Sequence, residues 1–168
     1  IRDSVHTTDF TLITKGAVKN VLSVCTHVRT AQGITDLSTQ RAMVDELFLH
    51  LSSQGYRVLA VATKQLQRSQ VSQADESSMI LEGFLAFLDP LKPDVREDLQ
   101  QIHRLGIEPF LITGDNQHVA QYIGEQAGFK ADMVTSGEQL TKMSPEELNV
   151  VLQTCRIFAE IEPLQKVH

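Results

Sequence analysis

Four consecutive residues, Thr113, Gly114, Asp115 and Asn116, form the sharpest local feature of the sequence, because a threonine hydroxyl and a glycine backbone N–H suit a phosphoryl oxygen. They follow an apolar run at residues 110–112, so the pattern predicts a buried strand, a tight turn and then a helix. In open parallel sheets ligands bind at the carboxyl ends of strands, where helix N-termini offer free N–H groups. The same pattern also fits an ordinary turn in which Asp115 or Asn116 only caps the helix.

Two positively charged residues in the first half of the chain could hold an anionic ligand. Lys15 precedes Gly16 at a predicted strand end, where a nucleotide can approach the backbone closely. Arg57 begins a predicted strand at residues 57–63, and a guanidinium recognises phosphate through two parallel N–H groups. Most such side chains are solvated or pair with surface carboxylates, so each motif alone is unspecific.

Two further candidates, Asp89 and Lys166, follow predicted strands in the second half of the chain. Pro90 and the proline at position 93 stiffen the turn at Asp89. A lysine at the position of Lys166 can neutralise phosphate charge. A rigid turn and a solvated terminus also explain these two residues. The six histidines have no metal-ligand spacing, so we expect no metal site in this chain.

Composition excludes several classes of protein. The 168 residues are 42% hydrophobic and 21% charged, which is typical of a globular protein. Fifteen Lys and Arg against twenty-one Asp and Glu give a net charge of −6, which argues against binding to nucleic acid or to an anionic membrane surface. No apolar run approaches the roughly 20 residues of a membrane-spanning helix. Cys25 and Cys155 are widely separated, so we expect reduced thiols.

The sequence pattern of the first 82 residues predicts a mixture of helices and strands. Residues 1–14 predict a hairpin, and a helix is expected to begin at residues 15–17. Its apolar face would carry Val18, Val21, Leu22 and Cys25. A second helix is expected from Ser38, its N-cap, to just before Gly55, with an apolar stripe. That stripe consists of Val44, Leu47, Phe48 and Leu51. The polar residues 65–78 predict a long loop and a domain boundary.

After this loop strands and helices alternate. We expect strands at residues 79–88, 109–113 and 157–161 and near Met133. Helices are expected at residues 94–105 and 116–127, and after the capping box that begins at Ser144. That last helix would carry Leu148, Val151, Leu152 and Cys155 on its apolar face. Apolar strands that alternate with helices are typical of a parallel sheet covered on both faces. The predicted fold class is therefore α/β.

The candidate motifs, taken in their order along the chain, resemble P-type cation-transporting ATPases. The motifs are Lys15-Gly16-Ala17, Gly55-x-Arg57-Val58-Leu59-Ala60, Asp89-Pro90, Thr113-Gly114-Asp115-Asn116 and Phe158-Ala159-x-x-x-Pro163-x-x-Lys166. The likeness extends over residues 1–168. Residues 83–128 are most similar to the bacterial magnesium-transporting subgroup, so the resemblance implies cation transport with Mg²⁺ as the ion of that subgroup.

The resemblance implies two domains. Residues 1–82 would be the C-terminal part of a mixed α+β nucleotide-binding domain. Residues 83–168 would be part of a phosphorylation domain with a haloacid-dehalogenase-like, Rossmann-type parallel sheet. The chain would then be a soluble piece of an integral membrane protein, on the cytoplasmic side of the membrane. Its partners would be a nucleotide and the transmembrane and actuator domains of the same polypeptide.

Residue roles follow from the same resemblance. Lys15 and Gly16 would line the ATP pocket together with Leu59, and Arg57 would reach the ATP phosphates. Thr113, Gly114 and Asp115 would face the transferred phosphoryl group. Asp89 would lie at the domain hinge. Lys166 would balance the charge of an aspartyl phosphate. ATP and Mg²⁺ are the implied cofactors of the whole pump.

The chain departs from the family pattern at three positions and lacks two of its motifs. Val18 and Lys19 replace a Pro-Glu pair, and Glu160 replaces an arginine that helps to bind nucleotide. The D-K-T-G-T motif with the phosphorylated aspartate would precede residue 1, and the G-D-G-x-N-D motif would follow residue 168. We therefore expect this chain alone to be inactive as an ATPase.

Two alternatives remain open from the sequence. The first is a stand-alone haloacid-dehalogenase-like phosphatase, for which Asp89 is the only candidate nucleophile, although no D-x-D motif is present there. The second is an interaction module, because a sheet cut from a larger domain leaves open strand edges. On that ground we expect the purified chain to form a dimer or to exchange strands.

Overall fold

The chain divides into two compact units in a computed structural model that describes residues 10–162. The first unit comprises Ile1–Phe48 and Val58–Ala86, and the second comprises Leu49–Arg57 and Phe87–His168. Most of the hairpin expected at residues 1–14 lies outside the described residues. Among the described residues, no helix has both the length and the apolar character that crossing a membrane requires.

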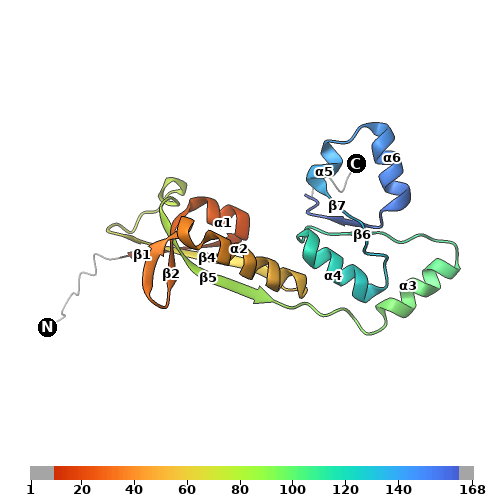
Figure 1. The fold of residues 1–168 in the computed structure, drawn as a ribbon, viewed down its shortest axis with the longest axis horizontal. Helices are drawn as coiled ribbons and strands as arrows, with labels where there is room; N and C mark the ends of the chain where they lie inside the picture. The colour runs from red at the N-terminus through yellow and green to blue at the C-terminus, as the bar shows by residue number, and fades with distance from the viewer. Residues whose placement is uncertain (1–9, 163–168) are drawn as a thin grey trace. The chain divides into compact units, whose positions relative to one another are not determined.

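The first unit is built on a five-stranded mixed sheet with the order β1-β4-β5-β2-β3 (Figure 1). The strands are β1 (Phe10–Ala17), β2 (Cys25–Thr30), β3 (Gly33–Asp36), β4 (Arg57–Leu66) and β5 (Met79–Phe87). Strand β1 pairs with β4 in antiparallel orientation, and so does β2 with β3, whereas β2 and β5 run parallel. This mixed sheet confirms the α+β architecture expected for the first part of the chain.

Two helices, α1 (Val18–Val24) and α2 (Leu37–Ser53), supply the rest of this unit. Buried side chains on α1, α2, β2, β4 and β5 form its core. They are Val18, Val21, Leu22, Cys25, Val28, Leu37, Val44, Val58, Ala60, Ala62, Met79 and Leu81. Alternate residues of β4 are buried, while Leu59 and Val61 between them stay partly exposed. The helices therefore cover one face of the sheet, and the other face carries the partly exposed side chains.

Three local predictions for this unit were wrong. Residues 15–17 are the end of β1 rather than the start of a helix, because their backbone completes the pairing with β4. The carboxylate of Asp36 accepts a hydrogen bond from the backbone N–H of Ser38 at 2.7 Å, so Asp36 rather than Ser38 holds the start of α2. Leu47 is 49% exposed and does not belong to the core.

Two strand assignments also differ from the prediction. The hairpin of β2 and β3 occupies residues 25–36, where the sequence indicated only a turn near Gly33. Residues 79–87 form β5, which belongs to the first sheet, whereas the alternation of strands and helices predicts it in the parallel sheet of the second half. An apolar strand gives no indication of which of two sheets it joins, because both interiors are apolar.

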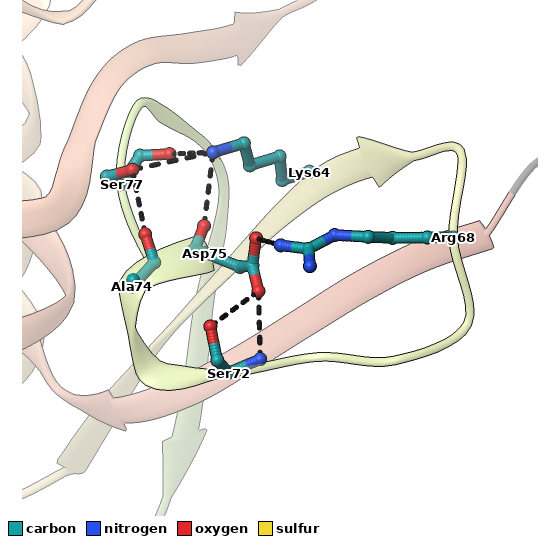
Figure 2. A network of polar contacts seen from close by, with 6 residues as sticks. All are labelled: Lys64, Arg68, Ser72, Ala74, Asp75 and Ser77. Carbon is teal, nitrogen blue, oxygen red and sulfur yellow. Dashed lines mark hydrogen bonds and ion pairs between the residues drawn. The ribbon is translucent and has the colours of Figure 1, made fainter.

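The polar segment between β4 and β5 is an ordered loop rather than a loose linker (Figure 2). A short 3₁₀ helix, η1 (Gln73–Asp75), lies inside it. The buried Asp75 carboxylate pairs with Arg68 and accepts hydrogen bonds from the Ser72 backbone N–H at 2.8 Å and the Ser72 hydroxyl at 2.9 Å. The Lys64 ammonium donates to the carbonyl oxygens of Asp75 at 3.1 Å and Ser77 at 2.6 Å. Local polar bonds thus replace the apolar core that this segment lacks.

The Asp75 network predicts a pH dependence of stability. The pKa of Asp75 is lowered from its ordinary value of 3.8, first by the backbone N–H of Ser72, then by the Ser72 hydroxyl and by Arg68. A carboxyl with a depressed folded-state pKa adds stability that is present above its ordinary pKa and is lost as pH falls through the depressed value. The Asp75→Asn variant should therefore have a lower free energy of unfolding than the unaltered chain at about pH 7. The difference between the two free energies should become smaller below about pH 4.

Urea unfolding of both proteins across this pH range measures this difference. The control is Asp45→Asn, which alters an exposed surface pair with Arg41 and should show a small, flat difference. A gap between Asp75→Asn and the unaltered chain that stayed constant down to about pH 2 would contradict the assignment.

The second unit is built on a three-stranded parallel sheet with the order β6-β8-β7. Its elements are α3 (Val95–Arg104), β6 (Leu111–Ile112), α4 (Gln117–Ala127), β7 (Val134–Ser136), α5 (Gly137–Thr141), α6 (Pro145–Thr154) and β8 (Ile157–Ala159). The parallel pairing confirms the α/β expectation for this part. The strands are shorter than predicted, and α5 was not predicted.

The central strand β8 carries the core of this unit on both its faces. Ile157 and Ala159 pack with Ala120 of α4 on one side of the strand, while Phe158 on the other side packs with Cys155 and with partly buried Val151 of α6. All three residues of β8 are at most 4% exposed. The second unit therefore depends on one short, fully buried strand.

The helix boundaries of the second unit follow the capping residues in the sequence. The Asn116 side chain caps α4 by accepting from the backbone N–H of Val119 at 3.1 Å, and Gly128 ends the same helix with a φ of +94°. Ser144 and Glu147 form the expected capping box at the start of α6. Leu152 is 44% exposed, so the predicted apolar face of α6 is only partly covered.

Candidate functional site

The loop at residues 113–115 lies at the carboxyl end of β6 and is fixed by main-chain hydrogen bonds to the neighbouring segment. The N–H of Thr113 donates to the carbonyl of Phe158 at 2.9 Å, and the N–H of Ile161 donates to the carbonyl of Thr113 at 3.0 Å. The N–H of Glu160 donates to the carbonyl of Asp115 at 2.8 Å. The ladder between β6 and β8 therefore continues past both strands and holds the loop in place.

Side chains in this loop bond to each other and to Arg57. The Thr113 hydroxyl donates to Oδ2 of Asp115 at 2.9 Å and accepts from the Asp115 N–H at 3.1 Å. The Nε of Arg57 lies 2.7 Å from Oδ1 of Asp115, so both carboxylate oxygens have a donor. The Arg57 side chain is 60% exposed, which leaves part of its guanidinium to solvent. Three predicted site residues thus meet within the second unit.

The position of this loop suits an anion. Asn116 begins α4 immediately after the loop, so the unpaired N–H groups and partial positive charge of the helix N-terminus lie beside it. Gly114 is exposed at the turn and has an ordinary negative φ. A threonine hydroxyl, exposed backbone and a guanidinium in one place can bind phosphoryl oxygens.

A cavity of about 440 Å³ adjoins this loop in the second unit. Arg57, Thr113 and Asp115 line it, together with Asp89 and Lys92. Sequence reasoning gave no role to Lys92, although it lies in the same proline-flanked turn as Asp89. The sequence does show a lysine between two prolines. That pattern predicts a rigid turn but does not indicate which strand end the turn lies near.

The nucleotide-binding candidates of the first unit lie on the partly exposed face of its sheet. Lys15 pairs with Val61 and Ala17 pairs with Leu59 across the β1–β4 ladder. Paired residues of antiparallel strands point to the same side, so Lys15, Leu59 and Val61 share one face. Arg57 begins β4 with the same alternation as Leu59. Lys15 itself is exposed.

Two other predicted positions are less informative. Gly16 lies inside β1, and a side-chain methyl there would meet Val21 at an ordinary contact distance of 3.6 Å, so packing alone does not require glycine. Lys166 lies outside the described residues. Asp89 follows β5, a strand of the first sheet, and therefore does not lie at the carboxyl end of a strand of the parallel sheet.

Glu160, which replaces the family's arginine, has an unusual backbone conformation. Its φ is +54°, in the left-handed region that favours glycine, and its side chain is exposed. That conformation allows its N–H to reach the carbonyl of Asp115. Glu160 thus contributes its backbone to the loop while placing a negative charge near the candidate phosphate site.

Magnesium does not fit the residues described here. Mg²⁺ requires near-octahedral oxygen ligands, and the donors Thr113 and Arg57 already use part of the lone-pair capacity of the Asp115 carboxylate. Within residues 10–162, no three His, Cys, Asp or Glu side chains are grouped as a metal site would need. Any magnesium at this site would take its ligands from elsewhere.

Comparisons with known proteins define the family. A family model of the P-type ATPase cytoplasmic domain N matches residues 1–94, and a model of haloacid dehalogenase-like hydrolases matches residues 63–163. The first of these covers more than half of the chain, so this chain belongs to the P-type ATPases.

Individual relatives agree with this assignment. The chain is 35% identical to the "Magnesium-transporting ATPase, P-type 1" of Escherichia coli K12 over 158 residues, which are 92% of this chain and 18% of that relative. It is 31% identical to the "Cation-transporting ATPase pma1" of Synechocystis over 94% of this chain and 18% of the relative. The "Calcium-transporting ATPase 1" of Bacillus cereus is 29% identical over 98% of this chain and 19% of the relative. The chain therefore spans less than a fifth of the length of these relatives.

The site geometry predicts a high cost for altering Gly55. Its φ is +83°, and a β-carbon there would overlap the ring of Tyr122 on α4. We expect Gly55→Ala to lower the free energy of unfolding by about 2–4 kcal/mol, from backbone strain and steric overlap together. Urea unfolding measures this change.

Gly106 offers a matched control for this variant. Its φ of +77° is nearly the same, but a β-carbon there would meet no atom within 4 Å. Gly106→Ala should therefore cost only about 1 kcal/mol. Equal costs at the two glycines would mean that Gly55 does not pack on Tyr122.

Proposed function

We propose that this chain binds ATP and forms part of the phosphorylation machinery of a cation-transporting P-type ATPase, at the cytoplasmic side of a membrane. The observation that carries the proposal is the β1–β4 register, which gives Lys15 and Leu59 one common sheet face. Residues 1–82 would belong to the nucleotide-binding domain and residues 83–168 to the phosphorylation domain. The two family models match residues 1–94 and 63–163, which supports the order of the two domains along the chain.

The sheet face offers complementary surfaces for a nucleotide. Leu59 and Val61 are apolar and partly exposed, as contact with a purine ring requires. The ammonium of Lys15 lies on the same face and would attract the phosphates. Gly16 follows Lys15 directly, so the nucleotide could approach the backbone there. Arg57, at the start of β4, would contact the phosphates through the guanidinium nitrogens that Asp115 does not hold.

The 113–115 loop would face the phosphoryl group during transfer. In the whole pump an aspartate from outside this chain would attack the γ-phosphorus of ATP, forming a carboxyl–phosphate bond as the bond to ADP breaks. Thr113 and Gly114 would hold phosphoryl oxygens, and Lys166 would balance their charge. Water would later hydrolyse the aspartyl phosphate. Mg²⁺ would accompany the nucleotide, with ligands that this chain does not supply.

Coupling to transport would involve the remaining domains of the polypeptide. The relatives named as magnesium-transporting support Mg²⁺ as the transported ion. Transmembrane and actuator domains would then be intramolecular partners of this chain. Among the described residues the outer strands are β1 and β3 in the first sheet and β6 and β7 in the second. These open edges support the expectation that the isolated chain dimerises.

ATP binding is the first test of the proposal. We expect weak ATP binding to the 168-residue chain in titration calorimetry. Lys15→Ala should weaken it about tenfold, because a charge-assisted contact is lost, and Arg57→Ala should weaken it similarly. Lys19→Ala and Arg41→Ala are matched controls, since both side chains are exposed on helices away from the sheet face. Equal ATP affinity in Lys15→Ala and Lys19→Ala would contradict the assignment of Lys15.

The chain alone should not turn over ATP. The reason is that it lacks the D-K-T-G-T aspartate of the family. Purified chain with Mg²⁺ and ATP should release phosphate no faster than the buffer. Hydrolysis of p-nitrophenyl phosphate that is abolished by Asp89→Asn would instead support a stand-alone phosphatase. The place of Asp89 after a strand of the first sheet argues against that function.

The negative charge of Glu160 should weaken ATP binding. Replacing this exposed glutamate by arginine restores the family's positive charge near the site, so we expect Glu160→Arg to tighten ATP binding about fivefold or more at low salt. Glu160→Gln, which only removes the negative charge, should give a smaller gain. An unchanged dissociation constant for both variants would show that Glu160 lies too far from the bound phosphates to act on them.

A further inference from the structure

The segment that follows from the end of α2 contacts α4 and the two residues before it at three places in the second unit. The Nδ2 of Asn116 donates to the hydroxyl of Ser52 at 3.2 Å. Gly55 lies against the ring of Tyr122, and Arg57 pairs with Asp115. The contacting residues at 52, 55 and 57 all belong to the segment Leu49–Arg57 of this unit. One short segment thus carries Arg57 to the 113–115 loop.

Ser52 stands out in this segment because it is a polar residue with no exposed surface. Its backbone carbonyl accepts from the N–H of Gly55 at 3.0 Å, and the carbonyl of Leu51 accepts from the N–H of Tyr56 at 3.2 Å. This pair of bonds around a left-handed glycine is the Schellman motif that ends a helix. The backbone of Ser52 therefore shapes the turn, while its side chain fastens the turn to Asn116.

Asn116 links this contact to the candidate site. Its Oδ1 accepts from the backbone N–H of Val119 and starts α4, while its Nδ2 is directed to Ser52. The residue immediately before it, Asp115, holds Arg57. A shift of the Ser52 turn away from Asn116 would therefore also move Arg57 away from Asp115.

We propose that Ser52 is a positioning residue that keeps Arg57 on Asp115 and so presents its remaining guanidinium nitrogens to a phosphate. The exposed Arg57–Asp115 pair is too weak to fix the arginine by itself, because a solvated ion pair contributes little. The part-buried hydrogen bond of Asn116 to the buried Ser52 hydroxyl supplies the missing constraint. This inference rests on the proposed function, since it assigns the use of Arg57 to phosphate binding.

The first test measures the ion pair directly. In ¹⁵N NMR spectra of the 168-residue chain, the Nε–H of Arg57 should exchange slowly with water, and Asp115→Asn should remove this protection. Ser52→Ala should speed the exchange at least about threefold, the effect expected from losing one hydrogen bond. Ser53→Ala is the matched control, because the neighbouring Ser53 hydroxyl donates only to the carbonyl of His50. It should leave the exchange unchanged.

A second variant covers the case in which Ser52→Ala does not fold. Asn116→Ser retains a side-chain oxygen that can cap α4 but removes the amide that reaches Ser52. It should speed the exchange of the Arg57 Nε–H as Ser52→Ala does. Exchange equal to that of the unaltered chain in whichever of these variants folds would overturn the proposal.

ATP affinity separates positioning from a general loss of stability. Ser52→Ala should weaken ATP binding about threefold in the unaltered chain and have no further effect in an Arg57→Ala background. An equal loss in both backgrounds would mean that Ser52 acts independently of Arg57, which would also overturn the proposal. If the unaltered chain bound no ATP, the proposed function would fail, and the exchange measurement would still decide whether Ser52 positions Arg57.

Discussion

The 113–115 loop, on which the candidate phosphate site of the second unit is built, depends on the main-chain ladder between β6 and β8. Strand β8 is buried on both faces and cannot slide without exposing Ile157 and Phe158. The ladder continues into residues 160 and 161, where two more N–H groups bond to the carbonyls of Thr113 and Asp115. The 113–115 loop is thus fixed by backbone atoms. The side chains of Thr113 and Asp115 are not needed to hold the loop and can contact each other and Arg57.

That rigid loop organises the charges around it. Asp115 receives the Thr113 hydroxyl on one carboxylate oxygen and Arg57 on the other, so a negative and a positive charge balance each other beside the N-terminus of α4. The guanidinium of Arg57 is already oriented before a phosphate binds. The entropic cost of binding is therefore lower than for a mobile arginine side chain. In the first unit the pairing register of β1 and β4 positions the candidate nucleotide-binding side chains, because it determines which residues share a face with Lys15.

The sequence was most informative where local chemistry decides the structure. The cap at Ser144 and the helix end at Gly55 are confirmed, and Asn116, one of two predicted capping residues, is the N-cap of α4. Each satisfies helix-end groups within a few residues. The motif order also indicated the family. What could not be predicted depends on distant partners: β5 joins the first sheet, and residues 15–17 extend a strand because β4 lies beside them.

The candidate site was predictable in its parts but not in its contacts. Thr113, Asp115 and Arg57 were recognised from motifs, yet their hydrogen bonds and the cavity lined by Lys92 follow from tertiary packing. Ser52 carried no signal at all, since a serine near a helix end is ordinarily exposed. The roles assigned from the family pattern all stay predictions; they concern Lys15, Gly16, Arg57, Leu59, Thr113, Gly114, Asp115 and Lys166.

The central claim, that one face of the first sheet binds ATP, is tested most directly by methyl NMR. ATP is titrated into the chain with labelled leucine and valine methyl groups. Leu59 and Val61, on the face shared with Lys15, should shift, whereas buried Val58 on the opposite face should not. Shifts at Val58 without shifts at Leu59 and Val61, or no shifts at any of the three at saturating ATP, would contradict the account.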